Sequence, residues 1–411
     1  MAIIGGGPAG LLAAIAAAEH GAAVTLLEKN DRLGAKMLLS GGGRCNITNT
    51  GDVNHLVQSF PGNGKFLYHA FSKFTSRDIL DLLAEEGVAT REEEKGRVFP
   101  ASDDAGEVVE ALARRAYSRG VNIRLDTQVV DILRHPDKAE GFQVQIKGGE
   151  VLEADKVIIC TGGVTYPQTG STGDGYTWAS RFGHHIVTAR PAMAALETVE
   201  EWPARVQGVT LKNVEVVVRS ETKVVTKYCE DVLFTHFGLS GPAIINISGQ
   251  AAKALEEGPV KIGIRTDSDL RADDWEARLQ MALREHPRQL LKSLVARWWP
   301  ASLAEVLLEV HGIPPEVMAN QVTKVHRRQT AELLDEFTLQ LKKARPLETA
   351  MVTAGGVDTN EVDPYTMQSR LVKGLFFAGE ILDVNGISGG YNLQEAYSTG
   401  YLAGSSAAGA S

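Results

Sequence analysis

The feature that most restricts the fold of this chain is a glycine pattern near its amino-terminal end, in the segment MAIIGGGPAGLLAAIAAAEHGAAVTLLEKN. Ala2–Ile4 is a short apolar strand, and a G-x-G-x-x-G pattern follows it directly. A helix rich in alanine and leucine comes next, then a second apolar strand over Val24–Leu27 that ends at Glu28. This order of strand, glycine turn, helix and strand predicts a βαβ unit that binds a dinucleotide.

Each position of the pattern has its own physical task. We expect Gly5 to permit the tight turn, Gly7 to let a pyrophosphate approach the backbone, and Gly10 to let the helix pack closely on the strand. The helix N-terminus then presents free N–H groups and its positive dipole end to the phosphates. Glu28 is placed to accept hydrogen bonds from a ribose diol. No Gly-Lys-Ser/Thr follows, so a Walker A loop is excluded.

Size and composition limit the possible partners of the chain. It has 411 residues, which suggests two or three domains, and 44% hydrophobic and 23% charged residues are typical of a globular protein with a sizeable core. The net charge of -9 argues against general binding of nucleic acid or of an anionic membrane, although it is compatible with a local basic patch. We therefore expect a small-molecule substrate, with no nucleic-acid or membrane partner; the oligomeric state stays open.

The cysteines indicate the compartment. Cys45, Cys160 and Cys229 are far apart, odd in number and never arranged as CxxC, so neither a disulfide framework nor a zinc site is predicted. We expect a reducing, cytoplasmic setting and no metal. The start of the chain lacks the basic and apolar regions of a signal peptide, and no apolar run approaches the ~20 residues of a membrane-spanning helix.

FAD and a nicotinamide dinucleotide use the same glycine turn, so other segments have to distinguish them. Near the carboxyl-terminal end, LVKGLFFAGEILDVNGISGGYNLQEAYSTGYLAG contains an apolar strand that ends just before Glu380. An acid after such a strand, Glu380 or Asp383, suits the ribityl hydroxyls of FAD. Gly389-Gly390 then precedes a helix whose N–H groups can stabilise negative charge at the edge of a reduced flavin.

A third segment, ADKVIICTGGVTYPQTGSTGDGY, contains an apolar strand that ends at Thr161-Gly162-Gly163, where the backbone can approach a nucleotide. Before it, NIRLDTQVVDIL alternates like a strand, and Val129 is placed to present its backbone to adenine. Each of these signals is weak alone. Their order along the chain favours FAD over NAD as the bound cofactor.

With these motifs in view, the chain resembles the bacterial FAD-dependent flavoproteins of the aminoacetone oxidase-like family, which also includes bile-acid enone reductases. The shared motifs extend over nearly the whole chain: GGGPAG, LGAKMLLSGGGRCNITN, GRVFPAS, TGGVTYPQTGSTGDGY, LFTHFGLSGPAI and GLFFAGEILDVNGISGGYNLQEA. The second and the last are specific. The resemblance implies an FAD-binding fold of the glutathione-reductase type. PAMAALET, at 191–198, lacks the proline–leucine pair common in the family, so the entry to the middle domain is expected to differ.

The resemblance also implies that SGGGRCNITN, at 40–49, is a flavin loop, and its residue types suit that role. Lys36 and Arg44 supply positive charge, and the three consecutive glycines let backbone N–H groups face an anion such as the pyrophosphate. Asn46 adds a neutral hydrogen-bonding group. Cys45 lacks the nearby second cysteine of a dithiol relay, so we interpret it as a packed or backbone-positioning residue.

These segments together supply the predicted site. The residues expected to bind the cofactor are Gly5, Gly7, Pro8, Ala9, Gly10, Glu28, Lys29, Lys36, Gly42, Gly43, Arg44, Cys45, Asn46, Val129, Thr161, Gly162, Gly163, Gly379, Glu380, Asp383, Gly389, Gly390, Tyr391, Asn392 and Leu393. Two residues are candidates for catalysis. His236 stands beside a glycine turn in LFTHFGLSGP, where a structural role is the alternative, and the loop of Tyr391 is expected near the flavin.

The predicted fold is α/β, a discontinuous Rossmann-like FAD-binding domain over 1–190 and 350–411. Residues 191–268 alternate and are rich in β-branched residues, so we expect an inserted β-rich domain there, followed by a helical subdomain over 269–349. No second G-x-G-x-x-G occurs. NAD(P)H, as electron donor, is therefore expected to visit the flavin transiently and to have no Rossmann domain of its own.

These observations predict an FAD-dependent oxidoreductase that uses NAD(P)H to reduce an activated double bond or a related small substrate. The first alternative is a flavin oxidase of a small amine with dioxygen as acceptor, because the sequence does not determine oxygen reactivity. An alternative of another class is a flavin-containing RNA-associated protein or a non-catalytic scaffold. Neither a Ser-His-Asp order nor an H-E-x-x-H sequence indicates a hydrolytic centre.

Overall fold

The computed structural model describes residues 1–136, 140–221 and 223–409, and the contacts within it divide the chain into two units. Unit 1 joins Met1–Arg190 to Leu347–Ser411, so it is discontinuous in sequence, and unit 2 comprises Pro191–Pro346. The first boundary coincides with the expected one, and the return lies at 347 instead of 350. Each unit has its own hydrophobic core.

The core of unit 1 contains a parallel sheet with the strand order β19–β10–β1–β2–β6. Ile3 of β1 pairs with Ile158 on one side and with Leu26 on the other. All three residues are fully buried, as the continuous apolar runs of internal parallel strands predict. The strands span Ala2–Ile4 (β1), Thr25–Leu27 (β2), Asn122–Arg124 (β6), Val157–Ile159 (β10) and Leu375–Phe377 (β19).

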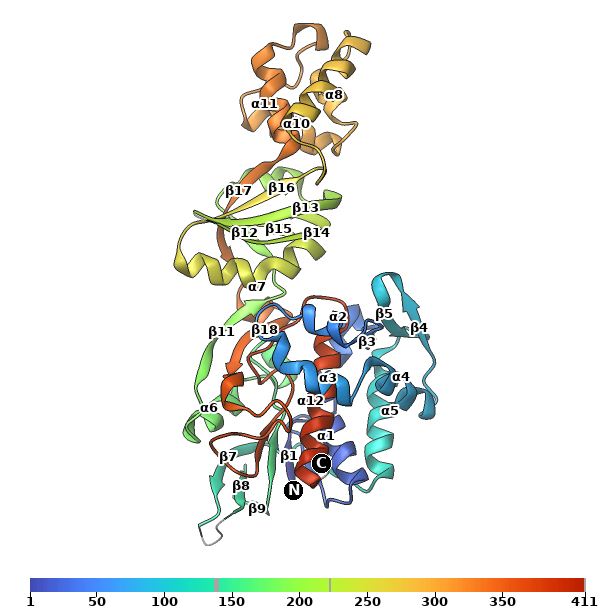
Figure 1. Cartoon of the computed structure of the whole chain (residues 1–411), viewed down its shortest axis with the longest axis vertical. Helices are drawn as coiled ribbons and strands as arrows, with labels where there is room; N and C mark the ends of the chain where they lie inside the picture. The colour runs from blue at the N-terminus through green and yellow to red at the C-terminus, as the bar shows by residue number, and fades with distance from the viewer. Residues whose placement is uncertain (137–139, 222, 410–411) are drawn as a thin grey trace. The chain divides into compact units, whose positions relative to one another are not determined.

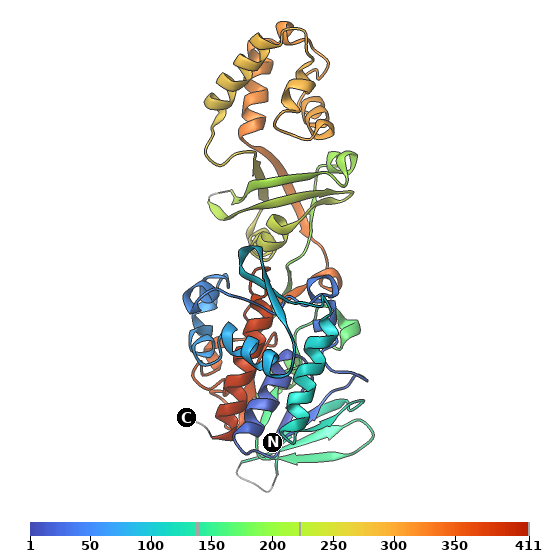
Figure 2. The ribbon, with the colours of Figure 1, turned by 90° about the vertical axis from the view of Figure 1, so that its right-hand side faces the viewer.

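Helices α1 and α12 pack side by side, and α5 lies next to α1 (Figures 1 and 2). The first two approach so closely that a Cβ at Gly400 would lie 2.2 Å from the carbonyl oxygen of Ala9. One turn on, a Cβ at Gly404 would lie 2.2 Å from the carbonyl oxygen of Ala13. Neither glycine can therefore carry a side chain without moving the helices apart. The helices span Pro8–Glu19 (α1), Ala105–Ser118 (α5) and Tyr391–Ala408 (α12).

Smaller elements surround this core. Strands β3, β5 and β4 form one antiparallel sheet, and β7, β8 and β9 form another. Strands β11 and β18 pair with each other where the chain leaves unit 1 and returns to it. The bounds are Thr48–Asn49 (β3), Thr90–Glu93 (β4), Arg97–Pro100 (β5), Val129–Arg134 (β7), Phe142–Ile146 (β8), Val151–Ala154 (β9), Ile186–Ala192 (β11), Val352–Val357 (β18), Val53–Gln58 (α2), Tyr68–Lys73 (α3), Ser76–Glu85 (α4) and Asp174–Arg181 (α6).

The segment NIRLDTQVVDIL differs from the single strand that its alternation predicts. Strand β6 ends at Arg124 in the parallel sheet, whereas β7 begins at Val129 in an antiparallel one. Between them Asp126 adopts a positive φ of 49°, and the Thr127 N–H donates to the carbonyl oxygen of Glu28 at 2.8 Å. The chain turns here without a glycine or a proline, so the residues that usually indicate a turn are absent from this part of the sequence.

Unit 2 is built around a closed barrel with the strand order β12–β15–β14–β13–β16–β17 (Figure 1). Strand β17 pairs with β12 and closes it. This strand lies within the segment expected to be helical. Its residues alternate, with Phe337, Leu339 and Leu341 buried, which is the pattern of a strand with one face in the core. The strands span Leu196–Thr198 (β12), Thr210–Ser220 (β13), Val224–Thr235 (β14), Gly238–Ser240 (β15), Val260–Arg265 (β16) and Phe337–Ala344 (β17).

All but one of the described α-helices of unit 2 lie in an insertion between β16 and β17, and the remaining one connects β15 to β16. The rings of Trp275 and Trp298 pack edge to face with centroids 5.5 Å apart, and Trp299 donates from Nε1 to Thr266 Oγ1 at 2.8 Å. The tryptophans therefore pack helices together. Among the described residues of both units, no helix has the length and apolarity to cross a bilayer. The helices span Pro242–Glu257 (α7), Ala272–Glu285 (α8), Leu291–Val295 (α9), Ala301–Val310 (α10) and Lys324–Asp335 (α11).

Candidate cofactor and active site

The glycine turn between β1 and α1 closes tightly on one side and is open on the other. Gly5 adopts a positive φ of 105°, and a Cβ there would lie 2.4 Å from the carbonyl oxygen of Cys160. A Cβ at Gly10 would lie 1.8 Å from the carbonyl oxygen of Gly5, a distance that no side chain can adopt. A Cβ at Gly7 would meet no described atom within 4 Å. The backbone at Gly7 is therefore accessible, as the approach of a pyrophosphate requires.

The acid at the end of β2 is held by backbone N–H groups. Glu28 Oε2 accepts a hydrogen bond from Gly6 N at 2.6 Å, and Oε1 accepts one from Asn30 N at 2.8 Å. These bonds fix the carboxylate beside the glycine turn, where a ribose contact is predicted. Lys29, expected in the same site, instead forms an ion pair with Asp174, with 2.8 Å between Nζ and Oδ2.

The loop at 40–46 presents open backbone in the way its three glycines suggest. Gly41, Gly42 and Gly43 have positive φ values of 58°, 71° and 90°. A Cβ at Gly42 or Gly43 would meet no described atom within 4 Å. Successive N–H groups in such a turn can surround an anion, so the loop fits the predicted contact with a phosphate.

Arg44 differs from the prediction that its charge faces the pyrophosphate. Its Nη1 lies 2.9 Å from Glu93 Oε1 and 3.4 Å from Asp103 Oδ1. The guanidinium also lies over the ring of Phe99, 4.0 Å from the centroid. Arg91 shares both carboxylates, so two cations and two acids form one cluster, and the structure favours a role for Arg44 in holding the loop against β4 and β5.

Cys45 is buried in the same loop, and the adjacent Asn46 is half-buried. Burial raises the pKa of the Cys45 thiol to about 11, so the residue is not a thiolate at neutral pH. This burial favours the packing interpretation over a redox role. The side-chain oxygen of Asn46 is also buried and, within the described part of the chain, has no hydrogen-bond partner. A buried acceptor of this kind fits a bound group that donates to it.

Lys36 and Glu380 are 344 residues apart in sequence and form an ion pair, with 2.6 Å between Nζ and Oε2. Lys36 Nζ also donates to Thr165 Oγ1 at 2.6 Å. Glu380 Oε1 accepts a hydrogen bond from Thr353 N at 2.8 Å. The sequence suggested two separate contacts, a cation for the pyrophosphate and an acid for the ribityl chain. In the structure Lys36 and Glu380 instead form one ion pair, which can still hydrogen-bond to a ligand but carries no net charge.

The turn after β10 also contains a buried group without a partner. Thr161 Oγ1 is buried and has no hydrogen-bond partner among the described residues. A Cβ at Gly163 would lie 2.2 Å from Thr353 Oγ1, so close packing requires glycine there, and Gly162 adopts a positive φ of 71°. Val129 is 4% exposed at the start of β7. Its predicted contact with adenine stays a prediction.

Neighbouring atoms occupy the space beside the glycine turn before α12, whereas the turn before α1 is open at Gly7. A Cβ at Gly390 would lie 2.4 Å from the carbonyl oxygen of Thr48, and one at Gly389 would lie 2.6 Å from the ring of Tyr391. Helix α12 starts at Tyr391, directly after the glycine pair. The first turn of the helix therefore packs against β3 and against its own leading loop.

Two side chains hold the loop that leads to this turn. Asn392 Oδ1 accepts a hydrogen bond from Gly386 N at 2.8 Å, and Nδ2 donates to the carbonyl oxygen of Gly386 at 3.1 Å. Asp383 Oδ1 accepts from Gly355 N at 3.0 Å, and Oδ2 accepts from Asn63 Nδ2 at 3.1 Å. Both residues thus have structural partners, and their predicted contacts with the cofactor remain predictions.

Tyr391 has a partner that the sequence did not reveal. Its hydroxyl oxygen lies 2.8 Å from His55 Nε2, and the two ring centroids are 5.7 Å apart. Tyr391 is 6% exposed, whereas His55, on α2, is exposed. The two residues are 336 positions apart, and no local pattern links them. This pair provides a hydroxyl and an imidazole that can share a proton.

His236, the other predicted catalytic residue, belongs to unit 2. It is exposed in the turn between β14 and β15, and its ring packs edge to face on that of Phe237 at 4.9 Å. Phe237 in turn contacts the guanidinium of Arg345, 4.8 Å from the ring centroid. The catalytic role of His236 stays a prediction.

A buried acid within α12 also escaped the sequence analysis. Glu395 is 3% exposed, and burial raises the pKa of its carboxyl group to about 8, so the group is largely protonated at neutral pH. Thr399 Oγ1 lies 3.3 Å from Glu395 Oε1 and also accepts a hydrogen bond from Gly379 N at 3.0 Å. Helix α12 is buried on most of its sides, and a single glutamate one turn into it gives no local signal that it faces the core.

The open and unpartnered groups described above fit an FAD molecule. Backbone is accessible at Gly7 and at Gly42–Gly43, and an acid stands at the end of β2. Two buried side-chain oxygens, Asn46 Oδ1 and Thr161 Oγ1, have no partner in the described part of the protein. Helix α1 begins at Pro8, which has no N–H, so Ala9 supplies a further N–H group there, and Tyr391 to Leu393 supply others at the start of α12.

Comparison with known proteins identifies the family. The family model for the HI0933-like protein Rossmann domain matches residues 1–406. Ribosomal RNA dihydrouridine synthase of Escherichia coli is 33% identical over 405 residues, which are 97% of this chain and 95% of that protein. The 3-dehydro-bile acid delta(4,6)-reductase of Clostridium scindens is 32% identical over 410 residues, 99% of this chain and 98% of that protein.

A solved structure shows the same fold at lower identity. The 3-ketosteroid-delta4-(5alpha)-dehydrogenase of Rhodococcus jostii RHA1 is 16% identical, with a TM-score of 0.52 over 99% of this chain and 96% of that one. The predicted fold class, a Rossmann-type FAD-binding domain with an additional domain, is confirmed. The chain belongs to the HI0933-like family and is an FAD-dependent oxidoreductase.

Proposed function

We propose that the protein reduces a carbon–carbon double bond conjugated to a carbonyl group, with NAD(P)H as the electron donor. One observation carries this reaction class. Two relatives that align over nearly the whole chain have different substrates in their names, a bile acid and ribosomal RNA, and both names describe this reduction. The uracil ring, like an enone, has its reducible double bond next to a carbonyl.

The residues of unit 1 would hold the cofactor as follows. Glu28 would bind the ribose of the adenosine part, and the backbone at Gly7 and at Gly42–Gly43 would bind the pyrophosphate. The first turn of α12 would lie at the flavin end. When bound, FAD supplies the two-electron chemistry of the reaction. The protein itself has to bind and orient the substrate and deliver a proton.

Tyr391 is the residue that we assign to the proton. Reduction of a conjugated double bond adds a hydride to the carbon far from the carbonyl and a proton to the carbon next to it. The Tyr391 hydroxyl is largely buried at the start of α12 and is hydrogen-bonded to His55. His55 is exposed to solvent and can return a proton to the phenol after each turnover. His236 stays the alternative donor.

Anaerobic half-reactions test the reaction class. We expect NADH or NADPH to bleach the flavin absorbance, and a conjugated enone, or uridine in a ribosomal RNA fragment, to restore it. Bleaching by small amines alone would instead establish the amine oxidase. A flavin that no donor reduces would establish the non-catalytic scaffold.

A pair of matched variants tests the proton donor. Tyr391→Phe is expected to slow the restoration of absorbance by the enone about 100-fold or more, within the range for loss of a general acid, and to leave bleaching by NAD(P)H intact. Tyr397→Phe is the control, because the Tyr397 hydroxyl is buried and has no partner among the described residues. His55→Gln should shift the pH profile of the second half-reaction. Equal rates for both tyrosine variants would transfer the assignment to His236.

A further inference from the structure

A groove in unit 1 lies outside the predicted cofactor site. Its volume is about 340 Å³, and none of the predicted cofactor residues lines it. Two segments form it, 62–66 before α3 and 359–370 before β19. It is linked to the cofactor region through Asn63, which lines the groove and donates from Nδ2 to Asp383 Oδ2 at 3.1 Å. A ligand in this groove would therefore lie next to Asn63, the partner of Asp383, which is predicted to contact the cofactor.

The charges around the groove are unbalanced. Of the described residues that line it, Lys65 and Arg370 are cationic and none is acidic. Both side chains are exposed, and in the described part of the chain neither cationic group has an acceptor. Asn360 adds an amide to the same lining. Unpaired cations around a groove favour an anionic ligand, because a charge without a partner attracts one from solution.

The carboxylates in the neighbouring segment are already occupied. Asp358 Oδ1 accepts hydrogen bonds from the backbone and side chain of Asn360, both at 2.9 Å. Asp363 Oδ1 accepts from Tyr365 N at 3.0 Å. Glu361 Oε2 accepts from His185 N at 2.8 Å and faces a buried histidine. None of these acids forms an ion pair with Lys65 or Arg370, so both cationic groups can still pair with an anionic ligand.

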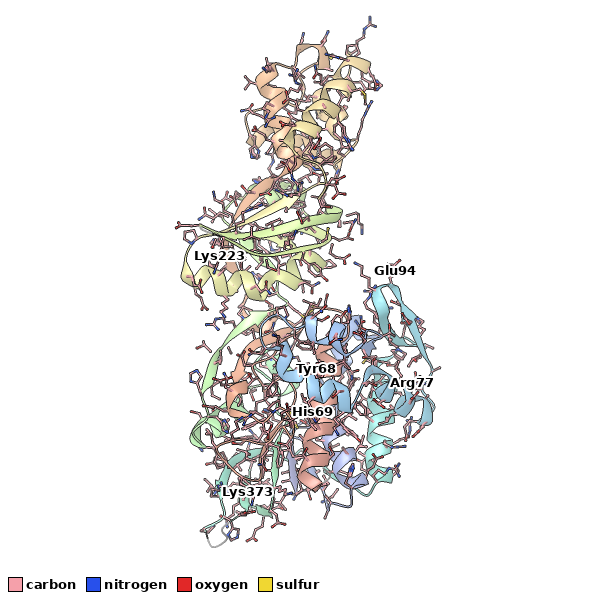
Figure 3. All side chains as sticks on the ribbon, in the orientation of Figure 1. Tyr68, His69, Arg77, Glu94, Lys223 and Lys373 are labelled. Atoms are coloured by element: carbon pink, nitrogen blue, oxygen red, sulfur yellow. The ribbon has the colours of Figure 1, made fainter. Side chains whose placement is uncertain are left out.

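Exposed aromatic rings lie beside the groove. Tyr365, in the same segment, is 66% exposed, and its ring packs edge to face on His69 of α3 at 5.0 Å. Tyr68 of the same helix is 53% exposed. Figure 3 shows Tyr68 and His69 on α3, with Arg77 and Lys373 toward the two edges of unit 1. Flat rings beside cations are the combination that binds single-stranded nucleic acid, with bases stacked and phosphates neutralised.

We propose that this groove binds the backbone of single-stranded RNA, with phosphates at Lys65 and Arg370 and a base stacked on Tyr365. The proposal rests on the proposed function, of which it specifies the substrate class as uridine in RNA. It revises the expectation of no nucleic-acid partner, which depended on the net charge and left room for a local basic patch. The volume is at the low end of the roughly 300–1,000 Å³ of ligand pockets, which suits one unit of a polymer better than a whole nicotinamide dinucleotide.

Fluorescence anisotropy of a labelled oligouridylate tests the proposal, with the FAD-loaded protein titrated at several salt concentrations. The variant Lys65→Ala/Arg370→Ala is expected to bind about tenfold more weakly at low salt, with a salt slope smaller by about 1.4 because two phosphate contacts are lost. Arg77→Ala/Lys373→Ala removes the same charge elsewhere on unit 1 and should bind like the natural protein. Tyr365→Ala should weaken binding about fivefold or more at every salt concentration.

The outcomes separate the possible ligands. Absence of oligouridylate binding at low salt, or equal loss in the two charge variants, overturns the proposal. Displacement of bound oligouridylate by NADPH, at the concentrations at which NADPH binds to the natural protein, also overturns the proposal. The groove would then bind the dinucleotide. FAD content and the thermal midpoint confirm that each variant is folded. Reduction of a small enone is measured separately, so its failure counts against the proposed function and leaves the binding result standing.

Discussion

Two helices that lie side by side in unit 1 begin in opposite ways. The turn before α1 is packed tightly at Gly10 and leaves Gly7 open, and no polar side chain caps it. The turn before α12 is filled by Tyr391, and polar side chains bond to one another around it. An open turn can accept a phosphate at its backbone. A filled turn instead positions side chains, and the proposed proton donor is the first residue of that helix.

The two helices also differ in what they bury. Helix α1 buries alanine, leucine and isoleucine, whereas α12 buries Gln394, Glu395, Ser398 and Thr399. Buried polar groups need partners, and a lost partner leaves a costly unpaired group. We therefore expect changes at the start of α1 to act through packing and ligand access, and changes in α12 to act through hydrogen bonding and protonation.

The largest effect is expected at Gly10. Gly10→Ala places a Cβ 1.8 Å from the carbonyl oxygen of Gly5, so β1 and α1 must separate. We expect a loss of more than about 3 kcal/mol in the free energy of unfolding, at the upper end of overpacking effects, with loss of bound FAD. Thermal unfolding and the ratio of flavin to protein absorbance measure both.

Gly7→Ala is the matched variant at the open end of the same turn. Its backbone, with φ of -79°, accepts alanine, and the added Cβ meets no described atom within 4 Å. We expect the fold to be kept and FAD to be bound at least about tenfold more weakly, since the methyl group occupies the approach of the pyrophosphate. If Gly7→Ala bound FAD as tightly as the natural protein, the open side of the turn at Gly7 would not be the place where the pyrophosphate binds.

The next effect is a pH dependence that comes from α12. Burial raises the pKa of Glu395 from 4.5 to about 8, so between these values the folded protein holds a proton that the unfolded chain has released. Stability is therefore lost as pH rises through this window, by up to about 1.4 kcal/mol per pH unit. Glu395→Gln has no proton to lose. Its stability relative to the natural protein should rise by about 3 kcal/mol between about pH 5 and pH 8, measured by urea unfolding.

The control for this titration is an exposed acid on a neighbouring helix. Glu110, on α5, is exposed, and Glu110→Gln should change the free energy of unfolding by the same small amount at both pH values. A flat difference for Glu395→Gln as well would mean that the carboxyl group is ionised in the folded protein and has found a partner.

The contrast between the helices also explains what the sequence could predict. The unit from β1 to β2 was predictable because its strands, glycines and terminal acid are contiguous, and periodicity reports local structure. The break between β6 and β7 was missed because the turn at Asp126 contains neither glycine nor proline. Strand β17 lies in the segment expected to be helical, although the alternation of Phe337, Leu339 and Leu341 indicates a strand; its place in the barrel depends on pairing with distant strands.

Within the candidate site the same limit applies to partners. The residue types and loops of the cofactor site could be named from motifs, but the ion pair of Lys36 with Glu380 and the contact of Tyr391 with His55 join residues more than 330 positions apart. No local pattern encodes such a pair, because the fold alone brings the residues together. Arg44 was assigned to the phosphate for the same reason, since its partners Glu93 and Asp103 follow far along the chain.

The smallest expected effect concerns the hydrogen bonds that anchor the start of α12. Thr48 Oγ1 donates to Gln394 Oε1 at 2.5 Å, and Gln394 Nε2 donates to the carbonyl oxygen of Phe74 at 3.2 Å and to Ser398 Oγ at 2.9 Å. Thr48→Val keeps the shape and leaves a buried acceptor without its donor, so we expect a loss of about 2 kcal/mol in the free energy of unfolding.

A double-mutant cycle decides whether this loss belongs to the pair. Gln394→Leu removes the acceptor, and in Thr48→Val/Gln394→Leu no unpaired group remains between these two positions. The carbonyl oxygen of Phe74 keeps a hydrogen bond from Ser398 Oγ at 2.7 Å. We therefore expect the double variant to lose about 1 kcal/mol less than the sum of the single losses. Strict additivity in urea unfolding would show that the two residues act independently, and that α12, like α1, is held at its start by packing alone.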